Sequence, residues 1–191
     1  MYRTTHLLKA ALLLALAAVP LRVGAQELGL YNSPKGIGAT LRQQEHDGIF
    51  HSALFYVDIY GVATSRCSYP GYKLNVSRQY VLKSIPRNGY TMTFYAGPGL
   101  SAGYVRDHDK GRGLDMTSLM SDYQGVMAGL SGDAGCRFDF GGNIALDLSL
   151  MAEAGVHVRQ DTKGGNFLKL SIYNNGLIQS VFPQLTFLFK L

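Results

Sequence analysis

The sequence predicts an all-β protein, in the form of a closed antiparallel up-and-down transmembrane β-barrel of about eight strands. Three observations support this prediction. Long stretches of the chain alternate between apolar side chains and small or polar ones, which is the period of a β-strand. The first residues have the pattern of an export signal. The rest contains no run of the ~18 apolar residues that mark a helical span, so strands that close on themselves must make any membrane crossing.

Residues 1–25 are expected to be a cleaved signal peptide. Two basic residues, Arg3 and Lys9, precede a run of ten apolar residues, and a small-residue cleavage site ends at Ala25. This run of ten is half of the roughly 20 residues that a spanning helix needs. We therefore expect residues 26–191 to form a single outer-membrane β-barrel domain.

The expected signal peptide carries much of the positive charge. It contains Arg3, Lys9 and Arg22 and no acid, so its removal lowers the formal net charge from +5 to +2 (5 minus 3). The remaining basic residues are scattered among acidic ones, which disfavours nucleic acid as a partner. The remaining 166 residues (191 minus 25) are enough for about eight crossings of roughly 9 to 11 residues each.

Turn residues divide the alternating stretches into pairs of strands. The short connections within the pairs are rich in glycine, asparagine and aspartate, which tolerate positive φ. Longer polar segments separate one pair from the next. In chain order the expected strands are 36–44 and 49–60 around 46–48, 71–83 and 90–106 around 86–89, 123–140 and 144–158 around 141–143, and 167–173 and 181–191 around 174–176.

This plan conflicts with one general feature of outer-membrane barrels. Short and long connections alternate strictly, which places both ends of an eight-strand chain beside the longer loops. Comparable barrels keep their termini beside the short turns. The conflict disappears if residues 27–32 begin an additional strand, or if residues 167–180 contain a loop instead of a full strand.

The two faces of each expected strand indicate which one meets lipid. In residues 144–158 one face is uniformly apolar, and the opposite face holds Asp147 and Glu153. A charged residue on the lipid side near the midplane costs roughly 2 to 4 kcal/mol, so we expect the apolar faces outside. Arg78 and Lys169 fall on apolar faces, and for them we expect an interfacial position or a local bulge that reverses the parity.

The same alternation also fits a soluble exported barrel of the lipocalin type, whose apolar face would surround a ligand. The opposite face favours the membrane barrel, because its many glycines would make an unusual soluble surface but suit a crowded lumen. These glycines are Gly97, Gly99, Gly103, Gly125, Gly129 and Gly135. The lipocalin-like barrel stays open as an alternative.

Several segments resemble a known family. They are Tyr95-Ala96-Gly97-Pro98-Gly99 with residues 103–107, the strand pair around Gly141, and residues 175–177 leading to 183–186. With them the chain resembles the small outer-membrane β-barrel proteins of Gram-negative bacteria, in particular the uncharacterised outer-membrane β-barrel family common in Bacteroidetes-type genomes. The resemblance covers residues 26–191 and implies an outer-membrane location, contact with outer-membrane lipids and recognition by the barrel-assembly machinery. Such proteins usually end in an aromatic residue, whereas this chain ends in Leu191, and the resemblance implies no activity.

Five charged residues on the polar faces form the candidate site. If residues 141–143 are a three-residue hairpin loop, Arg137 lies opposite Asp147 and a cross-strand ion pair points into the lumen. An eight-stranded barrel is just wide enough for side chains to fill it. We therefore expect an interior charge network that fills the barrel, and no transport pore. Its members are Arg137, Asp147, Asp133, Asp139 and Glu153.

No catalytic residue, cofactor or metal is expected. His108 lies between two aspartates, and His46 and His51 flank a turn, but neither a nucleophile elbow nor a residue that orients the base accompanies them. Three adjacent loop residues, 107–109, are also a weak metal site. The expected function is structural, or surface interaction through the longer loops of a monomeric barrel. A barrel-borne lipid hydrolase or acyltransferase stays open as the enzyme alternative.

The two cysteines are expected to be free thiols. Cys136 lies about 13 residues along its strand from Tyr123, some 40 Å at ~3.3 Å per residue, whereas Cys67 follows the second expected strand. A disulfide needs Cα atoms within about 7 Å of each other. Cys136 is expected to face lipid.

Overall fold

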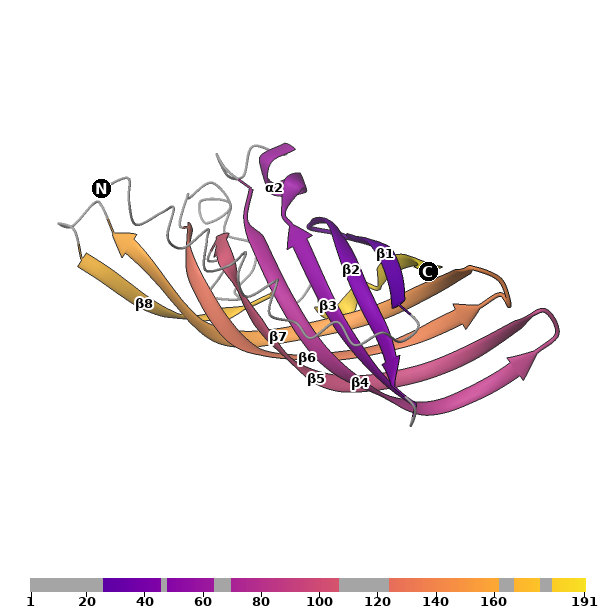
Figure 1. Cartoon of the computed structure of the whole chain (residues 1–191). Coiled ribbons are helices and arrows are strands. Elements are labelled where there is room, and N and C mark those ends of the chain that lie inside the picture. Colours follow the sequence, from indigo (N-terminus) through magenta and orange to yellow (C-terminus); the bar gives the residue numbers. More distant parts are fainter. Residues whose placement is uncertain (1–25, 46–47, 64–69, 107–123, 162–166, 176–179) are drawn as a thin grey trace.

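The computed structural model describes residues 26–45, 48–63, 70–106, 124–161, 167–175 and 180–191, so the expected signal peptide lies outside the described residues. This part of the chain is all-β, as predicted, and forms one antiparallel sheet of nine strands (Figure 1). It contains no helix that is long and apolar enough to cross a membrane. The strands are β1 (Gln26–Ser33), β2 (Gly36–Glu45), β3 (Ile49–Val57), β4 (Tyr72–Arg87), β5 (Tyr90–Arg106), β6 (Gln124–Asp139), β7 (Ile144–Asp161), β8 (Phe167–Asn174) and β9 (Gln184–Lys190), and the short helix α2 (Ile59–Ala63) follows β3.

The hydrogen bonds of the sheet run in a ring. Strands β1 to β7 pair in chain order, and β9 joins β7 to β1. Strands β8 and β9 lie along the same edge of β7, since Ala154 pairs with Asn174 of β8 and Ser149 pairs with Gln184 of β9. Both run antiparallel to β7, so they are consecutive segments of one wall strand. The ring therefore has eight positions.

An additional first strand resolves the conflict over the chain ends. The strand expected at 36–44 corresponds to β2, and β1 precedes it from Gln26 onwards. Glu27 of β1 pairs with Lys190 of β9. The start of β1 and the end of β9 therefore lie at the end of the ring that carries the β4–β5 and β6–β7 turns, whereas β3 and β5 end at the opposite end of the ring.

The end of the strand plan needs a correction. The expected turn at 174–176 does not reverse the chain, because β8 and β9 run in the same direction along β7. The strand expected at 181–191 begins at Gln184. Asparagine and glycine favour turns, so the sequence predicts a turn between the two segments. In the structure the two segments instead belong to one interrupted wall strand.

The register around the ring fixes the tilt of the strands. A path along paired residues leaves β7 at Ala154, passes through Leu130, Leu100, Val76, Ala53, Leu41, Leu28 and Phe189, and returns to β7 at Ile144. The path closes with an offset of ten residues (154 minus 144). Eight strands spaced ~4.8 Å apart with this offset, at ~3.3 Å per residue, must tilt by about 40° from the ring axis.

The side chains of the ring divide by parity, as predicted. Outward apolar residues are exposed, with Leu100 at 64%, Leu130 at 68% and Leu150 at 42%. Inward residues are buried even where they are charged, with Asp147 at 0% and Glu153 at 4%. The wall is therefore apolar outside and polar inside, which is the reverse of a soluble domain with an apolar core.

Arg78 lies on the outer face, as its parity indicated. It is exposed, its guanidinium is 3.8 Å from the Glu45 carboxylate, and it lies 5.5 Å from the ring centre of Tyr80. A β-bulge does occur in β4, but between Val81 and Lys83, so it does not alter the parity of Arg78.

The apolar parity assigned to Lys169 is wrong. The exposed apolar residues of β8 are Leu168, Leu170 and Ile172, which alternate with position 169. The Lys169 side chain lies outside the described residues.

Candidate functional site

Six of the buried charged residues, Glu27, Arg42, Lys73, Arg137, Asp147 and Glu153, belong to three groups along the axis of the ring. Each group joins strands that are not neighbours. The first group lies at the end where β1 begins and β9 ends. Arg137 of β6 donates two hydrogen bonds to Glu27 of β1, at 2.7 and 2.5 Å, and a third to Asp139 at 3.2 Å. Lys190 of β9 is 2.7 Å from the same Asp139 carboxylate. The bidentate arginine–carboxylate pair adds geometric specificity, and two cations and two acids leave the group neutral.

The second group crosses the centre of the ring. Arg42 of β2 donates to Asp147 of β7 at 2.5 Å, and Tyr95 of β5 donates to the other carboxylate oxygen at 2.7 Å. The Arg42 guanidinium also lies 5.1 Å from the ring centre of Tyr95 and 5.7 Å from that of Phe50. A buried ion pair is stable only when its remaining hydrogen-bonding groups are satisfied, and Tyr95 satisfies the second carboxylate oxygen.

The third group lies toward the opposite end. Lys73 of β4 forms an ion pair with Glu153 of β7, and its ammonium is 5.3 Å from the ring centre of Tyr56. Ser101 donates to the other oxygen of Glu153 at 2.6 Å, and Asn75 donates to Ser101 at 2.8 Å. Both carboxylate oxygens of Glu153 therefore have partners.

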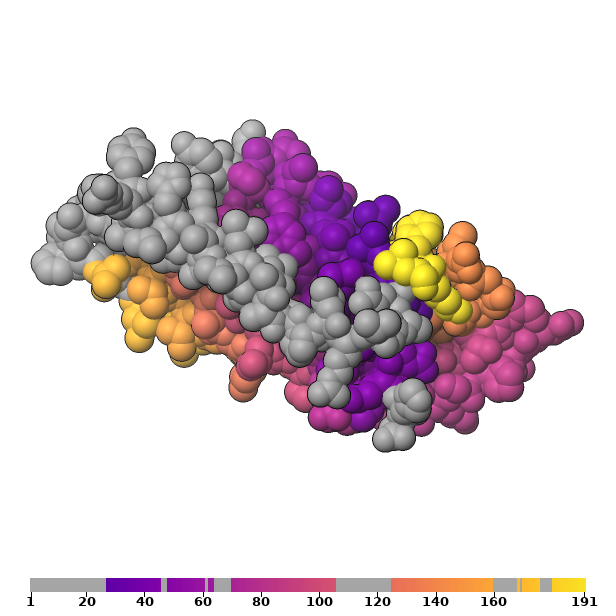
Figure 2. Space-filling model, in the orientation of Figure 1, coloured from indigo at the N-terminus to yellow at the C-terminus, as the bar shows by residue number. Residues whose placement is uncertain are grey.

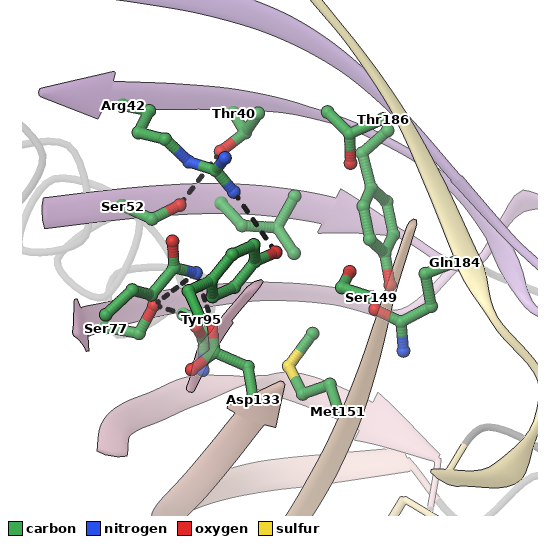
Figure 3. A pocket seen from close by; sticks show the side chains of 14 residues that line it. Thr40, Arg42, Ser52, Ser77, Tyr95, Asp133, Ser149, Met151, Gln184 and Thr186 are labelled. Atoms are coloured by element: carbon green, nitrogen blue, oxygen red, sulfur yellow. Dashed lines mark hydrogen bonds between the residues drawn. The ribbon is translucent and has the colours of Figure 1, made fainter. Parts of the chain in front are cut away.

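Asp133 is an interior acid with neutral partners. Its Oδ2 accepts hydrogen bonds from Gln79 and, at 3.2 Å, from Ser77. It lines a cavity of about 30 Å³ with Arg42 and Tyr95 (Figure 3). Three buried atoms of the lining residues, Arg42 Nε, Gln79 Oε1 and Asp133 Oδ1, have no partner within the described chain. The volume and the polar lining of the cavity therefore suit a water molecule.

The predicted register is confirmed, and the predicted ion pair is wrong. Arg137 lies opposite Asp147 in the β6–β7 ladder, as the three-residue loop requires. Its side chain instead binds Glu27, while Asp147 is held by Arg42. In a narrow tilted ring, side chains from opposite walls meet across the lumen, so a long side chain reaches a distant strand. The five residues singled out from sequence all lie inside the ring, in the first group (Arg137, Asp139), the second (Asp147), the third (Glu153) and the cavity wall (Asp133).

Five members of the network are not identified from the sequence: Glu27, Arg42, Lys73, Tyr95 and Lys190. Each lies on the inward parity of its strand, so a count of charged and phenolic residues on those parities would have found them. The partners could not be found in this way. Glu27 and Arg137, for example, are 110 positions apart.

The residues considered for catalysis or metal binding do not gather into a site in the described chain. His46 and His108, with the two aspartates beside His108, lie outside the described residues. His51 is exposed on the outer face, 3.1 Å from the carboxylate of Glu45. Within the described residues no group of three or more histidine, cysteine, aspartate or glutamate side chains could hold a metal ion.

Cys136 is a free thiol on the outward parity of β6, as predicted. Cys67 lies outside the described residues.

A single asparagine bridges the interruption between β8 and β9. The Asn175 side chain donates to the Met151 carbonyl at 2.6 Å and accepts from the Glu153 amide at 3.1 Å. Its own backbone N–H donates to the Glu153 carbonyl at 3.3 Å. Lys35, at the β1–β2 turn, donates to the Asn175 carbonyl at 2.6 Å. Asn175 thus satisfies backbone groups of β7 that a paired strand would otherwise satisfy.

No family model, curated protein or solved structure matches this chain. The chemistry of the interior therefore has to be argued from its own geometry. Ion pairs hold the opposite walls of the ring together and fill its centre, leaving a cavity of about 30 Å³.

Proposed function

We propose that this protein is an integral outer-membrane β-barrel, exported by a cleaved signal peptide, with a structural role or a surface-interaction role through its longer loops. The observation that carries the proposal is the combination of outward apolar faces with a polar, ion-paired interior. A closed strand barrel satisfies its backbone hydrogen bonds within the wall, which hydrocarbon requires. Lipid would then cover the outward leucines, whose exposure to water is unfavourable in free energy.

The height of the apolar band supports this proposal. On β5 the outward aromatic residues Phe94 and Tyr104 enclose Ala96, Leu100 and Ala102. The two aromatic residues are ten positions apart (104 minus 94), or ~33 Å along the strand and about 25 Å along the axis at a tilt near 40°. Outer-membrane barrels carry an apolar band of about 25 Å between two aromatic girdles.

Both aromatic rows continue on β4. Tyr104 stacks on Tyr72, with ring centres 6.0 Å apart. Tyr80 and Phe94 belong to the opposite row, because Tyr80 pairs with Ala96, two positions from Phe94. Arg78 lies two positions from Tyr80 on the side toward Tyr72, about 5 Å inside this row along the axis. Its guanidinium extends back to the Tyr80 ring and the Glu45 carboxylate, toward the edge of the band.

The interior supports a structural role better than transport. Three ion-paired groups cross the lumen, and the cavity between them holds about 30 Å³. We propose a monomer with outer-membrane lipids and the assembly machinery as partners, and with no cofactor. Recognition of other molecules then belongs to the longer loops.

The described residues give no specific support to the two alternatives. A lipocalin-type barrel would point Leu148 and Leu150 inward, whereas they are 37% and 42% exposed. A lipid hydrolase would need a Ser–His pair that substrate can reach. Ser171 Oγ is 3.5 Å from His157 Nδ1, but His157 is 0% exposed and its Nε2 is 3.1 Å from the Val105 carbonyl.

Membrane fractionation combined with gel mobility tests the proposal. We expect the chain in the outer-membrane fraction after carbonate washing, and we expect unheated samples to migrate differently from boiled ones because a closed barrel stays folded in detergent. A soluble chain with a single mobility would refute the proposal. Lipid hydrolysis or acyl transfer that His108→Ala abolishes would favour the enzyme alternative.

A further inference from the structure

One hairpin extends beyond the ring at the end where β1 begins and β9 ends. Strand β3 begins at Ile49, opposite Tyr80, whereas β4 continues to Arg87 and returns through β5 from Tyr90. We call residues 81–95 the arm. It projects past the β6–β7 turn in Figure 1 and protrudes from the surface in Figure 2, in magenta. The arm therefore reaches farther from the ring than the neighbouring strands.

The β-bulge at the base of the arm changes which residues face outward. Below the bulge Lys83 pairs with Phe94, Ile85 with Met92, and Arg87 with Tyr90. Phe94, Met92 and Tyr90 belong to the outward parity of β5, which includes Leu100. Lys83, Ile85 and Arg87 therefore share the outward face of the arm. Without the extra residue, the uncharged positions 82, 84 and 86 would occupy that face.

The outward face of the arm carries cations without acids. The sequence from 79 to 106 contains no aspartate or glutamate. Lys83 and Arg87 are exposed, and within the described residues neither forms an ion pair. Two uncompensated positive charges thus lie on a face whose other members are apolar or aromatic, a composition that fits an anionic membrane interface.

The level of the two cations matches a headgroup layer. Lys83 lies beside Phe94 of the aromatic row, and Arg87 is four positions farther along, about 10 Å along the axis. The headgroup layer is ~5 to 7 Å thick on each side of the hydrocarbon. Long basic side chains can extend toward such a layer from either side of it.

We propose that Lys83 and Arg87 bind the phosphates of anionic phospholipids in the leaflet beside the β4–β5 and β6–β7 turns, an inference that rests on the proposed membrane barrel. A protein strand that added to the free edge of β4 is a poorer occupant. The bulge, Lys83 and Pro86 are features that blunt an edge strand against pairing.

The experiment measures lipid retention by the refolded chain. The chain is folded into vesicles of equal parts phosphatidylcholine and phosphatidylglycerol, released in mild detergent, and analysed by native mass spectrometry for the lipids it keeps. We expect phosphatidylglycerol to be preferred, and we expect Lys83→Gln/Arg87→Gln to lower that preference by about fivefold for each charge removed. Charge-conserving Lys83→Arg/Arg87→Lys and the inward Ser84→Gln should keep it.

The outcomes separate this inference from the proposed function. Each variant is first checked for heat-modifiable mobility and flotation with the vesicles; failure of the unaltered chain there refutes the barrel itself. A folded double Gln variant that keeps the full preference would overturn the lipid assignment. Crosslinking of Lys83 to a protein in cells, with no lipid preference in vesicles, would overturn it in favour of a protein partner.

Discussion

Asn175 takes the place of a missing stretch of strand beside β7. The pairing of β8 with β7 ends at Ala154 and that of β9 ends at Ser149, so four residues of β7, 150–153, lie between the two paired segments. Asn175 makes three hydrogen bonds to the backbone of Met151 and Glu153. An unpaired backbone group in hydrocarbon costs several kcal/mol. The wall strand can therefore be interrupted between β8 and β9, because the Asn175 side chain forms hydrogen bonds with the backbone groups of β7 at this point.

Replacing this amide should destabilise the protein strongly. Asn175→Leu keeps a similar side-chain size but leaves the Met151 carbonyl and the Glu153 amide without their side-chain partner. At ~1 to 3 kcal/mol for each buried unpaired group, the free energy of unfolding should fall by about 2 to 5 kcal/mol. Urea titration in lipid vesicles, followed by gel mobility, measures this loss. Asn32→Leu, which removes one exposed hydrogen bond from Tyr60, should change stability by less than about 0.5 kcal/mol, and equal losses for both variants would contradict the assigned role.

The Arg42–Asp147 pair should respond to single and double replacements differently. Arg42→Met leaves a buried carboxylate without its cation and should cost about 3 to 5 kcal/mol. In Arg42→Met/Asp147→Leu neither charge of this pair remains, so no charge is left without its partner and the loss should be smaller than the sum of the two single losses. The same urea titration, run as a double-mutant cycle, gives the coupling energy. Arg78→Met, which removes an exposed contact with Glu45, should cost only ~0 to 1 kcal/mol; strictly additive losses at the buried pair would show that it does not interact.

The inward glycines of β5 to β7 allow neighbouring strands to approach closely. A Cβ on Gly129 would overlap the Ala154 carbonyl and the Gly155 Cα, both backbone atoms of β7. A Cβ on Gly135 would overlap the Tyr95 hydroxyl, a side chain in the lumen. Space is therefore limited at both glycines, as the sequence indicated. At Gly135 the Tyr95 side chain in the lumen limits it, whereas at Gly129 the backbone of the adjacent strand does.

Gly129→Val should prevent the ring from forming. Because the overlapping atoms are backbone, no side-chain rotation relieves the contact, and the loss should reach about 4 kcal/mol or more. The folded fraction after dilution into detergent, read from unheated gels, measures the effect. Gly132→Ala on the same strand meets no heavy atom within 4 Å and should fold like the unaltered chain. Normal folding of Gly129→Val would mean that β6 and β7 separate more easily than their register suggests.

Alternation predicted the strands whose pairing is local. The β6–β7 hairpin is the clearest case, because its short loop fixes Arg137 opposite Asp147. Strand β1 was anticipated only as one of two alternatives, an additional strand beginning in residues 27–32, because it was inferred from the position of the chain ends and not from alternation. The continuity of β8 and β9 could not be predicted, because it depends on bonds from Asn175 to residues more than twenty positions away.

The same limit applies to the charged interior. Parity predicts which charged residues point inward, so all five residues singled out from sequence lie within the ring. It cannot predict their partners, because ring closure brings opposite walls together. The Lys73–Glu153 pair, for example, joins positions 80 apart in the chain.

The ring as a whole carries apolar side chains outside and polar side chains inside, the reverse of a soluble protein. This arrangement gives the most direct test of the proposed membrane location. Leu130 and Ser131 are adjacent in β6 but point to opposite sides, at 68% and 9% exposure. Leu130 also pairs with Leu100, between the two aromatic rows. In a soluble protein a thiol at 130 would be open to water, whereas in the proposed barrel it would be covered by hydrocarbon.

Leu130→Cys, made in a Cys67→Ser/Cys136→Ser background, should therefore resist a charged thiol reagent in lipid vesicles although its position is open. Hydrocarbon disfavours both the thiolate and the charged reagent, so labelling should be at least about tenfold slower than in urea. An apolar maleimide that partitions into the bilayer should still label it. Ser131→Cys is the matched control, because packing inside the ring should protect it from both reagents. Rapid labelling of Leu130→Cys by the charged reagent in vesicles would place the apolar face in water, and the membrane assignment would fail with it.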